Sequence, residues 1–417
     1  MVLALIVLAI LGAPLFIVIA TNAFWGYHQA GIDLQIVAIE FYSIAETPIL
    51  LAIPLFALAG YLLSESEAPA RLVRFTNAVL GWMPGGLAVV TIITSVLFSA
   101  FTGVSGVNII ALGALLYPAL LQANYKDRFS LGLVTTSGSI GLLFAPSLPL
   151  ILYGVIAKQP VDDLFLAGLL PGILFISVLS LYGIWQAPKA SRKIEDWSWP
   201  EVWGAIKESA WEIPLPFVVL GGIYSGVLAV SDAAVVTLVY VFIVEVLIRR
   251  EIAWRTLPRI IREAMILVGA ILMIIGVSFA STNVMIDQGI PQKLLASITG
   301  WVTDRTTFIV LLLLFFLVLG AIVDIFSAVV LVVPLLLPVA QEFGIHPIHL
   351  GIMFMAAMEL GYTTPPVGLN LFISAYRFDR SILSVYRATL PFFFIELVVV
   401  LIILFWPDLS LWLIGEN

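Results

Sequence analysis

The sequence predicts an all-α polytopic membrane protein built from two related halves. Of its 417 residues, 62% are hydrophobic and 11% are charged, whereas a soluble globular chain is about half apolar and about a quarter charged. Apolar runs of about twenty residues, long enough to cross a bilayer, recur along the whole chain. Proline and glycine interrupt these runs in a similar order in each half, which is typical of membrane transporters with broken helices.

Composition argues against several other classes of protein. The net charge is −7 and the few basic residues are dispersed, so no nucleic-acid partner is expected. Cysteine is absent, which excludes disulfides, thiol ligands and cysteine nucleophiles. The sequence has no Gly-x-x-x-x-Gly-Lys-Ser/Thr motif, so ATP is not expected to drive this chain directly.

The N-terminal part is predicted to form a span, an interfacial arm and a hairpin. Residues 2–20 are apolar without Lys or Arg, which indicates a first membrane helix rather than a cleaved signal. Residues 21–45 mix polar and aromatic side chains and are predicted to lie along the membrane interface. Residues 46–64 carry Pro54 and Gly60 within an apolar run, which favours a re-entrant hairpin over one straight span.

The rest of the first half contains two further interrupted segments. Residues 84–121 are too long for one span and are predicted to form two helices that meet at the polar stretch 99–108. Residues 130–157 are interrupted by small residues and prolines between 137 and 149. Residues 165–186 are predicted to form an uninterrupted span.

A polar connector separates the two halves. Residues 187–212 contain four tryptophans among mixed charges, which is typical of an interfacial segment. Spans are predicted at 213–230 and 233–248, and residues 249–262 form the most basic segment of the chain.

The second half repeats the order of the first. Residues 264–289 have a polar centre at 278–283 and are predicted to form a second hairpin. The remaining apolar segments are 307–340, which is interrupted at Gly320 and Asp324, the broken segment 352–376, and a last span at 390–406.

A fixed offset relates the two halves. Four pairs of proline or glycine residues are each separated by 220 positions, namely Pro118 and Pro338, Gly141 and Gly361, Pro146 and Pro366, and Pro171 and Pro391. Paired interruptions indicate two structural repeats with a binding site at their interface. Inverted repeats require an odd number of crossings between equivalent elements. The count from 46–64 to 264–289 comes out even if 84–121 crosses twice, so either 264–289 includes a crossing or one segment lies in the interface.

The distribution of Lys and Arg predicts which loops face the cytoplasm. Basic residues concentrate in five loops, whereas the termini carry none. The positive-inside rule therefore places these loops in the cytoplasm and both termini outside. The five loops are 64–74, 122–129, 187–212, 249–263 and 377–387.

The most unusual stretch is 359–370. Pro365 and Pro366 cannot continue a helix, and two threonines and an asparagine place polar atoms at the break. A break at membrane depth exposes carbonyls that lipid cannot satisfy, so it is tolerated where it lines a site or is buried in protein. A proline kink between packed helices is the alternative, but paired prolines with flanking glycines favour a site.

This stretch resembles the signature of the DctM-like large membrane subunit of tripartite ATP-independent periplasmic (TRAP) transporters. The most specific match is Thr364-Pro-Pro-Val-Gly368, and the similarity extends nearly end to end. The other matching motifs are Ile53-Pro-Leu-Phe-Ala-Leu-Ala-Gly60, Pro84-Gly-Gly86, Ser105-Gly106, Leu166-Ala-Gly-Leu-Leu-Pro171, and Gly320 with Asp324 followed by Pro334 and Pro338. Val230-Ser-Asp-Ala-Ala234 departs from the Thr-Pro-Thr-Glu-Ala-Ala more common in the family, which bears on a local helix start only.

The resemblance implies a multi-pass importer in the bacterial inner membrane and not an enzyme. Members of this family import organic acids, including sialic acid and C4-dicarboxylates, with the sodium gradient. A soluble periplasmic binding protein delivers the substrate, and a separate small four-helix membrane subunit braces the large one. No cofactor is expected, and sodium is the coupling ion. The large subunit is expected to work as an elevator, with a scaffold and a transport domain that holds two re-entrant hairpins.

These expectations divide the chain into five segments. They are a scaffold span and arm at 1–45, a first transport half with its hairpin at 46–186, connector and scaffold helices at 187–263, a second transport half with its hairpin at 264–389, and a C-terminal helix at 390–417.

Sodium prefers hard oxygen ligands, which unwound helix ends and Ser/Thr hydroxyls supply. The signature match favours this role over a polar packing cluster. The candidate sodium ligands are Gly103, Ser105, Gly106, Asn108, Ser137, Ser139 and Gly141 in the first half, and Gly320, Asp324, Gly361, Thr363, Thr364 and Pro366 in the second. The candidate substrate-cavity residues are Pro54, Ser278, Ser281, Thr282, Asn283 and Asn370.

Two alternatives remain open on the sequence. Asp324 and Glu359 are acids at apparent membrane depth, so a channel or a proton-coupled transporter could use them as a relay. Gly103-Val-Ser-Gly106 resembles the serine motif of intramembrane proteases, but that chemistry needs a histidine base on a neighbouring helix. His28, His346 and His349 all lie in predicted loops, which argues against a hydrolase.

A metal site at His346 and His349 is also not expected. Pro347 disfavours a helix that would bring the two histidines to one face, and no third ligand is evident.

Overall fold

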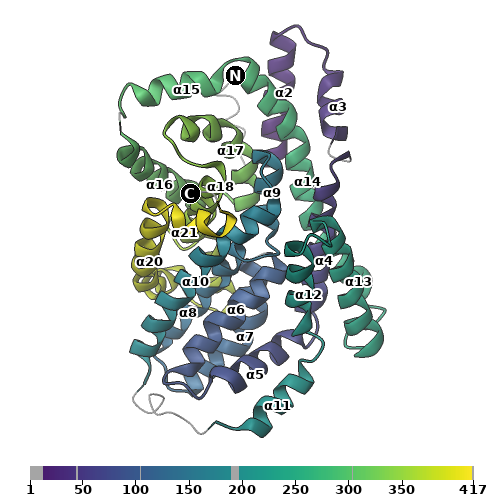
Figure 1. Cartoon of the computed structure of the whole chain (residues 1–417), viewed down its shortest axis with the longest axis vertical. Coiled ribbons are helices and arrows are strands. Elements are labelled where there is room, and N and C mark those ends of the chain that lie inside the picture. Colours follow the sequence, from purple (N-terminus) through teal and green to yellow (C-terminus); the bar gives the residue numbers. More distant parts are fainter. Residues whose placement is uncertain (1–12, 44–45, 104, 189–196, 303, 416–417) are drawn as a thin grey trace.

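A computed structural model describes residues 13–43, 46–103, 105–188, 197–302 and 304–415, and every regular element in these ranges is a helix (Figure 1). Seven helices are long and apolar enough to cross a membrane, and two bent helix pairs add to them. The predicted all-α polytopic class is therefore confirmed.

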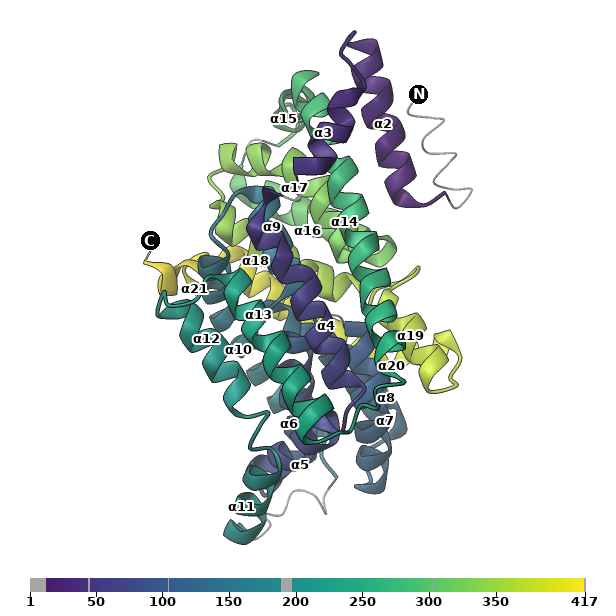
Figure 2. The same cartoon turned by 90° about the vertical axis from the view of Figure 1, so that its right-hand side faces the viewer.

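The N-terminal helices pack against one long helix of the second half. α2 (Leu15–Gln29) and α3 (Gln35–Ser43) both lie along α14 (Leu257–Asp287), as Figures 1 and 2 show. Ala23 and Tyr27 are buried in this contact, so α2 continues past the predicted end of the span at residue 20. The earlier part of that span, residues 2–12, lies outside the described residues.

Both hairpins are predicted in the wrong place. Residues 46–64 form a short turn, η2 (Pro48–Leu51), followed by one continuous helix, α4 (Ala52–Ser64). Pro54 falls in the first turn of α4, where a missing N–H breaks no intrahelical hydrogen bond. Residues 264–289 lie within the 31-residue helix α14. Its polar centre does not break the helix, and side chains of α2 and α3 bond two of its residues, Ser281 and Asn283.

The helix pairs with tight tips begin two elements further along each half. α6 (Gly86–Thr102) and α7 (Ser105–Gln122) meet at Gly103, and α16 (Arg305–Ile322) and α17 (Ile325–Glu342) meet at Val323 and Asp324. Gly103 has a φ of +66°, which favours glycine at this tip. The predicted breaks in 84–121 and 307–340 are therefore confirmed.

The two halves are inverted relative to each other. α5 (Ala68–Leu80) follows α4 after a bend of 75°, and α15 (Ile290–Thr299) follows α14. These two short arm helices lie at opposite ends of the molecule (Figure 1). α4 and α14 are equivalent single helices that begin the two halves. The even number of crossings was counted between two hairpins that the structure does not contain, so that count no longer argues against inverted repeats.

Broken helices complete each half. α8 (Asp127–Ile140) continues through η3 (Gly141–Leu143) and bends by 42° into α9 (Leu148–Ala157). α18 (Pro347–Gly361) ends before the prolines, and α19 (Leu369–Arg377) begins after Gly368. A long helix with an internal proline follows each break, α10 (Val161–Gln186) and α20 (Ile382–Phe405). α20 begins well before the predicted span at 390.

The connector and the C-terminus are short helices. α11 (Trp199–Glu208) precedes α12 (Pro214–Tyr224), whose 11 residues are fewer than the span predicted at 213–230. α13 (Val230–Phe242) continues through a π-helical turn, η5 (Ile243–Ile248), and packs against α4 (Figure 2). The last described helices are α21 (Asp408–Leu411) and η6 (Trp412–Ile414).

Ion pairs join the basic loops in two groups, one of three loops and one of two. Arg71 pairs with Glu212 and Glu251, which joins loops 64–74, 187–212 and 249–263. Arg380 pairs with Asp127 over 2.9 Å, which joins loops 122–129 and 377–387. These contacts agree with the placement of the joined loops on one side of the membrane; the identity of that side stays a prediction.

Candidate functional site

Each broken helix rests on the neighbouring helix pair through a glycine. A Cβ atom on Gly141 would lie 2.4 Å from Ser99 Cβ of α6. A Cβ atom on Gly361 would lie 2.7 Å from the Cα of Gly320 on α16. Real Cβ atoms do not approach other atoms so closely, so both breaks need glycine to reach their helix pair. The two breaks therefore make equivalent contacts in the two repeats.

A first oxygen cluster fills the contact between α6, α7 and α8. The Asn108 side chain donates to the Ser95 carbonyl over 2.8 Å and to Ser99 Oγ over 2.5 Å. Ser99 Oγ donates in turn to the Gly138 carbonyl, and Ser137 Oγ donates to Ser95 Oγ over 3.2 Å. Ser95 and Ser99 are not among the predicted sodium ligands, although Ser99 begins the predicted polar stretch 99–108 and their spacing of four places both on one face of α6.

A second oxygen cluster lies at the break between α18 and α19. The hydroxyls of Thr363 and Thr364 both donate to the Leu360 carbonyl over 2.9 Å. The N–H of Gly368 donates to the Ala321 carbonyl over 3.0 Å, which ties the break to α16. Thr363 is buried, so its hydroxyl oxygen and the helix-end carbonyls form a compact group of oxygen atoms.

The other predicted sodium ligands lie around these clusters. Gly103 forms the tip of the first helix pair, and Gly106 packs against α19. The Ser139 hydroxyl donates to a carbonyl of its own helix, and the Pro366 carbonyl accepts from the Tyr386 hydroxyl over 2.8 Å. Their role as sodium ligands stays a prediction.

Asn370 lies between the two clusters. Its Oδ1 accepts from Ser105 Oγ over 2.8 Å, and its Nδ2 donates to the Thr135 carbonyl over 3.4 Å. The Asn370 side chain is fully buried. The structure therefore brings the second broken helix against the tip of α7 and against the first broken helix.

The two acids of the sequence analysis occupy different environments. Asp324 is exposed and caps α17, because its carboxylate accepts from the Ser327 N–H over 3.0 Å and from the Ser327 hydroxyl. Glu359 is buried on α18, and neither carboxyl oxygen has a hydrogen-bond partner among the described residues. Glu396 of α20 is also buried, close enough for the two carboxyl groups to repel each other when charged.

The predicted substrate-cavity residues do not gather at one place. Asn22 of α2 donates to Ser281 Oγ over 2.9 Å, and Asn283 donates to Glu40 of α3 over 2.9 Å. Ser278 and Thr282 lie on the same helix, α14. Pro54 lines a cavity between α3, α4 and α14, and none of these polar residues lines it. The assignment of these five residues rested on hairpin tips that do not exist, whereas Asn370 does lie at the oxygen clusters.

A cavity of about 290 Å³ opens beside the second oxygen cluster. Thr363, Thr364 and Pro365 form one wall, and α20 forms the other with residues that include Arg387 and Thr389. The sequence predicts Arg387 in the basic loop 377–387 and not at a site, because the last span is predicted to begin at residue 390. The structure thus places an exposed guanidinium group next to the Thr-Thr-Pro-Pro break.

The geometry does not support hydrolase chemistry at Ser105. Its hydroxyl donates to Asn370, not to a histidine. His349 is not in a loop as predicted but is buried on α18, where its Nδ1 lies 3.2 Å from Ser410 Oγ. Among the described residues, no three His, Cys, Asp or Glu side chains form a group that could hold a metal ion.

Comparison with known proteins gives a consistent family match. Residues 2–409 match the family model described as tripartite ATP-independent periplasmic transporter, DctM component. An isethionate TRAP transporter permease protein DctMQ of Oleidesulfovibrio alaskensis is 30% identical over 97% of this chain, which spans 64% of that relative. The C4-dicarboxylate TRAP transporter large permease protein DctM of Vibrio cholerae is 30% identical over 97% of this chain and 94% of its own length.

Two more distant likenesses complete the comparison. The ectoine TRAP transporter large permease protein TeaC of Halomonas elongata is 27% identical over 99% of this chain and 98% of its own length. The crystal structure of the YdaH transporter of Alcanivorax borkumensis superimposes with a TM-score of 0.61 at 12% identity. It covers 91% of this chain and 88% of its own, so the fold extends over nearly the whole molecule.

Proposed function

Because the chain belongs to the DctM component family of tripartite ATP-independent periplasmic transporters, we propose that it imports an organic acid with the sodium gradient. Sialic acid and C4-dicarboxylates are the substrates proposed first. The observation that carries this proposal is the pair of buried oxygen clusters at equivalent breaks in two inverted repeats.

The chemistry of the two clusters suits sodium. Each combines hydroxyl oxygens with carbonyls at a helix end, where the helix dipole adds negative potential. The first cluster lies where α8 ends, and the second lies where α18 ends. Lipid offers no hydrogen bonds to such ends, so a bound cation would stabilise both. No other cofactor is proposed.

The cavity beside the second cluster suits an anionic substrate. Arg387 supplies a positive charge at its edge, and Thr363, Thr364 and Thr389 line it. A guanidinium group binds carboxylate or sulfonate groups through paired hydrogen bonds. This arrangement fits the C4-dicarboxylate and isethionate named for two of the relatives.

The contacts between helices suggest which helices form the scaffold and which form the transport domain of an elevator. α4, α13 and α14 pack together with the N-terminal helices and would form the scaffold. The two helix pairs and the two broken helices would move as the transport domain, with α5 and α15 as the arms between the two parts. This assignment places α4 in the scaffold rather than in a transport hairpin.

The proposed partners are those of a tripartite system. A small four-helix membrane subunit would brace the scaffold, and a soluble periplasmic binding protein would deliver the substrate. The proposed location is the bacterial inner membrane.

Uptake into proteoliposomes tests the proposal. The chain would be reconstituted with its small subunit and supplied with substrate-loaded binding protein, under an inward gradient of sodium or of potassium. We expect uptake only with sodium, and we expect it to persist when a protonophore abolishes any proton gradient. Equal uptake in potassium would contradict sodium coupling. Uptake driven by a proton gradient alone would instead favour a proton carried by Glu359 and Glu396.

A further inference from the structure

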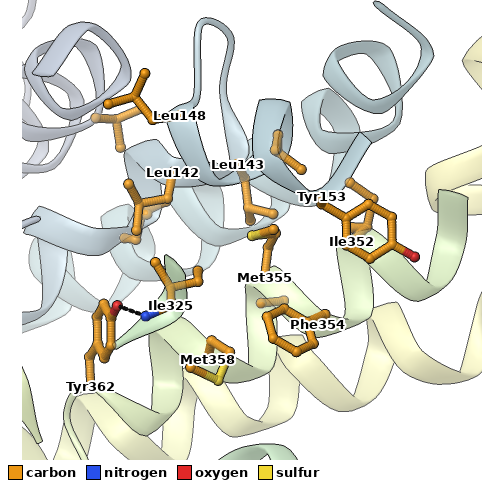
Figure 3. Close-up of a cluster of buried hydrophobic side chains, with 14 of the residues drawn as sticks. Leu142, Leu143, Leu148, Tyr153, Ile325, Ile352, Phe354, Met355, Met358 and Tyr362 are labelled. Atoms are coloured by element: carbon orange, nitrogen blue, oxygen red, sulfur yellow. Dashed lines mark hydrogen bonds between the residues drawn. The ribbon is translucent and has the colours of Figure 1, made fainter. Parts of the chain in front are cut away.

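A run of buried hydrogen bonds joins the tips of the two helix pairs. Ser105, the first residue of α7, donates to Asn370 Oδ1 over 2.8 Å. The N–H of Asn370 donates to the Tyr362 carbonyl over 3.3 Å. The Tyr362 hydroxyl accepts from the N–H of Ile325, the first residue of α17, over 2.7 Å (Figure 3). One residue of each tip is therefore bonded to the same short segment, 362–370.

Burial makes this link rigid. Each of the four residues exposes at most 3% of its surface. Water cannot replace a broken hydrogen bond at such a place, so breaking one leaves a buried polar group unsatisfied. The bonds of the link are therefore expected to form and break together.

The link also runs from one oxygen cluster to the other. Asn370 Nδ2 donates to the Thr135 carbonyl of α8, within one turn of Ser137 and Gly138 of the first cluster. Tyr362 directly precedes Thr363 and Thr364 of the second cluster. A shift of either tip would thus change the positions of residues in both clusters.

We propose that Tyr362 and Asn370 are positioning residues that couple the two clusters, so that sodium bound at one raises the sodium affinity of the other. This inference rests on the proposed sodium coupling. An ion at one cluster orders the adjacent tip, and the link transmits that order to the second tip. Binding of the second ion then requires a smaller loss of conformational entropy, which is positive cooperativity.

The sodium dependence of uptake in the reconstituted complex tests this coupling with Tyr362→Phe. Phenylalanine keeps the ring but removes the oxygen that accepts from the Ile325 N–H. We expect wild-type uptake to be sigmoidal in sodium and the Hill coefficient of Tyr362→Phe to fall towards one. The sodium concentration for half-maximal uptake should rise about five-fold, the equivalent of roughly one hydrogen bond. The rate at saturating sodium should change far less.

Tyr153→Phe is the matched control. Tyr153 is also fully buried and lies apart from Tyr362 and Ile325 (Figure 3). Its hydroxyl donates to the Pro347 carbonyl over 2.6 Å, outside the link. We expect its Hill coefficient to equal that of the wild type. An equal fall in both variants would overturn the proposal, because general loosening of the core would then explain the effect.

Asn370→Ala provides a second route to the same answer and also serves if Tyr362→Phe does not fold. The double variant should show no further fall in the Hill coefficient beyond either single variant, because both interrupt one link. Independent, additive effects would overturn the proposal. Sodium-independent uptake by the wild type would contradict the proposed function itself, whereas sodium-dependent uptake with an unchanged Hill coefficient in Tyr362→Phe would contradict only the coupling.

Discussion

Three glycines determine how closely the broken helices approach their helix pairs. Gly361 and Gly320 face each other with their Cα atoms in near contact, so α16 and α18 touch backbone to backbone. Gly141 makes the equivalent contact with α6. Such contacts allow carbonyl oxygens of two helices to converge, which no larger residue at these positions would permit.

Gly361→Ala should therefore destabilise the protein. The added methyl would lie 2.7 Å from the Gly320 Cα, a backbone atom that cannot move aside without shifting α16. We expect a loss of about 1–3 kcal/mol in the free energy of unfolding, measured by thermal unfolding in detergent. Gly269→Ala of α14 is the control, because nothing lies within 4 Å of its added methyl; a loss of similar size there would contradict the packing argument.

Thr363→Ala should weaken the sodium dependence of uptake while the protein stays folded. The Thr363 hydroxyl donates its proton to the Leu360 carbonyl, which leaves the oxygen lone pairs available to a cation. We expect the sodium concentration for half-maximal uptake to rise on the order of five-fold. Thr237→Ala of α13 removes a similar buried hydroxyl away from the site. An unaltered sodium response in Thr363→Ala would remove this residue from the proposed site.

Residue types alone predicted the breaks but not their partners. Pro365, Pro366 and Gly368 act on their own backbone, so their effect is visible in a short stretch of sequence. The contact of Ser105 with Asn370 joins residues 265 positions apart and depends on how the two repeats pack. Arg387 was predicted in a basic loop and not beside the cavity for a related reason, since its position depends on where α20 begins.

At the scale of elements, α5 is held by a buried ionic joint. Arg71 is 4% exposed and pairs with Glu212 over 2.6 Å, with Glu245 over 3.2 Å and with Glu251 over 2.5 Å. Burial opposes the ionisation of Glu251, yet hydrogen bonds from the Glu67 N–H and from Arg71 outweigh it and hold the pKa of Glu251 below its usual range. The joint therefore fastens the arm to the connector and to the end of α13.

Arg71→Met should loosen this arm strongly. Three carboxylates would then remain partly buried without their main countercharge, which costs about 3–5 kcal/mol for a broken buried pair. Thermal unfolding in detergent would measure the loss. Arg74→Met of the same helix is the matched control, because Arg74 pairs with Glu201 and Glu208 in an exposed position. Equal stability of Arg71→Met and wild type would show that the joint does not hold α5.

The misplaced hairpins show that a local sequence pattern does not decide whether a helix breaks. Prolines and small polar residues at 46–64 and 278–283 resemble helix breaks in sequence. Pro54 does not break α4 because it lies in the first turn of that helix, and Asn22 and Glu40 bond Ser281 and Asn283 of the polar centre of α14. Both outcomes depend on long-range partners, which a local pattern does not contain. The tips at Gly103 and Asp324 were visible as breaks because they interrupt the helix itself.

At the scale of the whole molecule, inversion of the repeats explains why two similar sites meet. The arms α5 and α15 lie at opposite ends, so equivalent helix pairs approach the middle from opposite sides (Figure 1). Their tips are then joined through 362–370, which contacts both. A single repeat would expose its helix ends to lipid, whereas two inverted repeats bury each other's breaks.

The most direct test of sodium coupling is a measurement of sodium movement driven by the substrate. The reconstituted complex would receive radioactive sodium at equal concentration on both sides, a clamped membrane potential, and substrate-loaded binding protein on the outside. We predict that sodium accumulates inside as the substrate enters, because each transport cycle carries both. Entry of the substrate without any change in the sodium content would contradict the account.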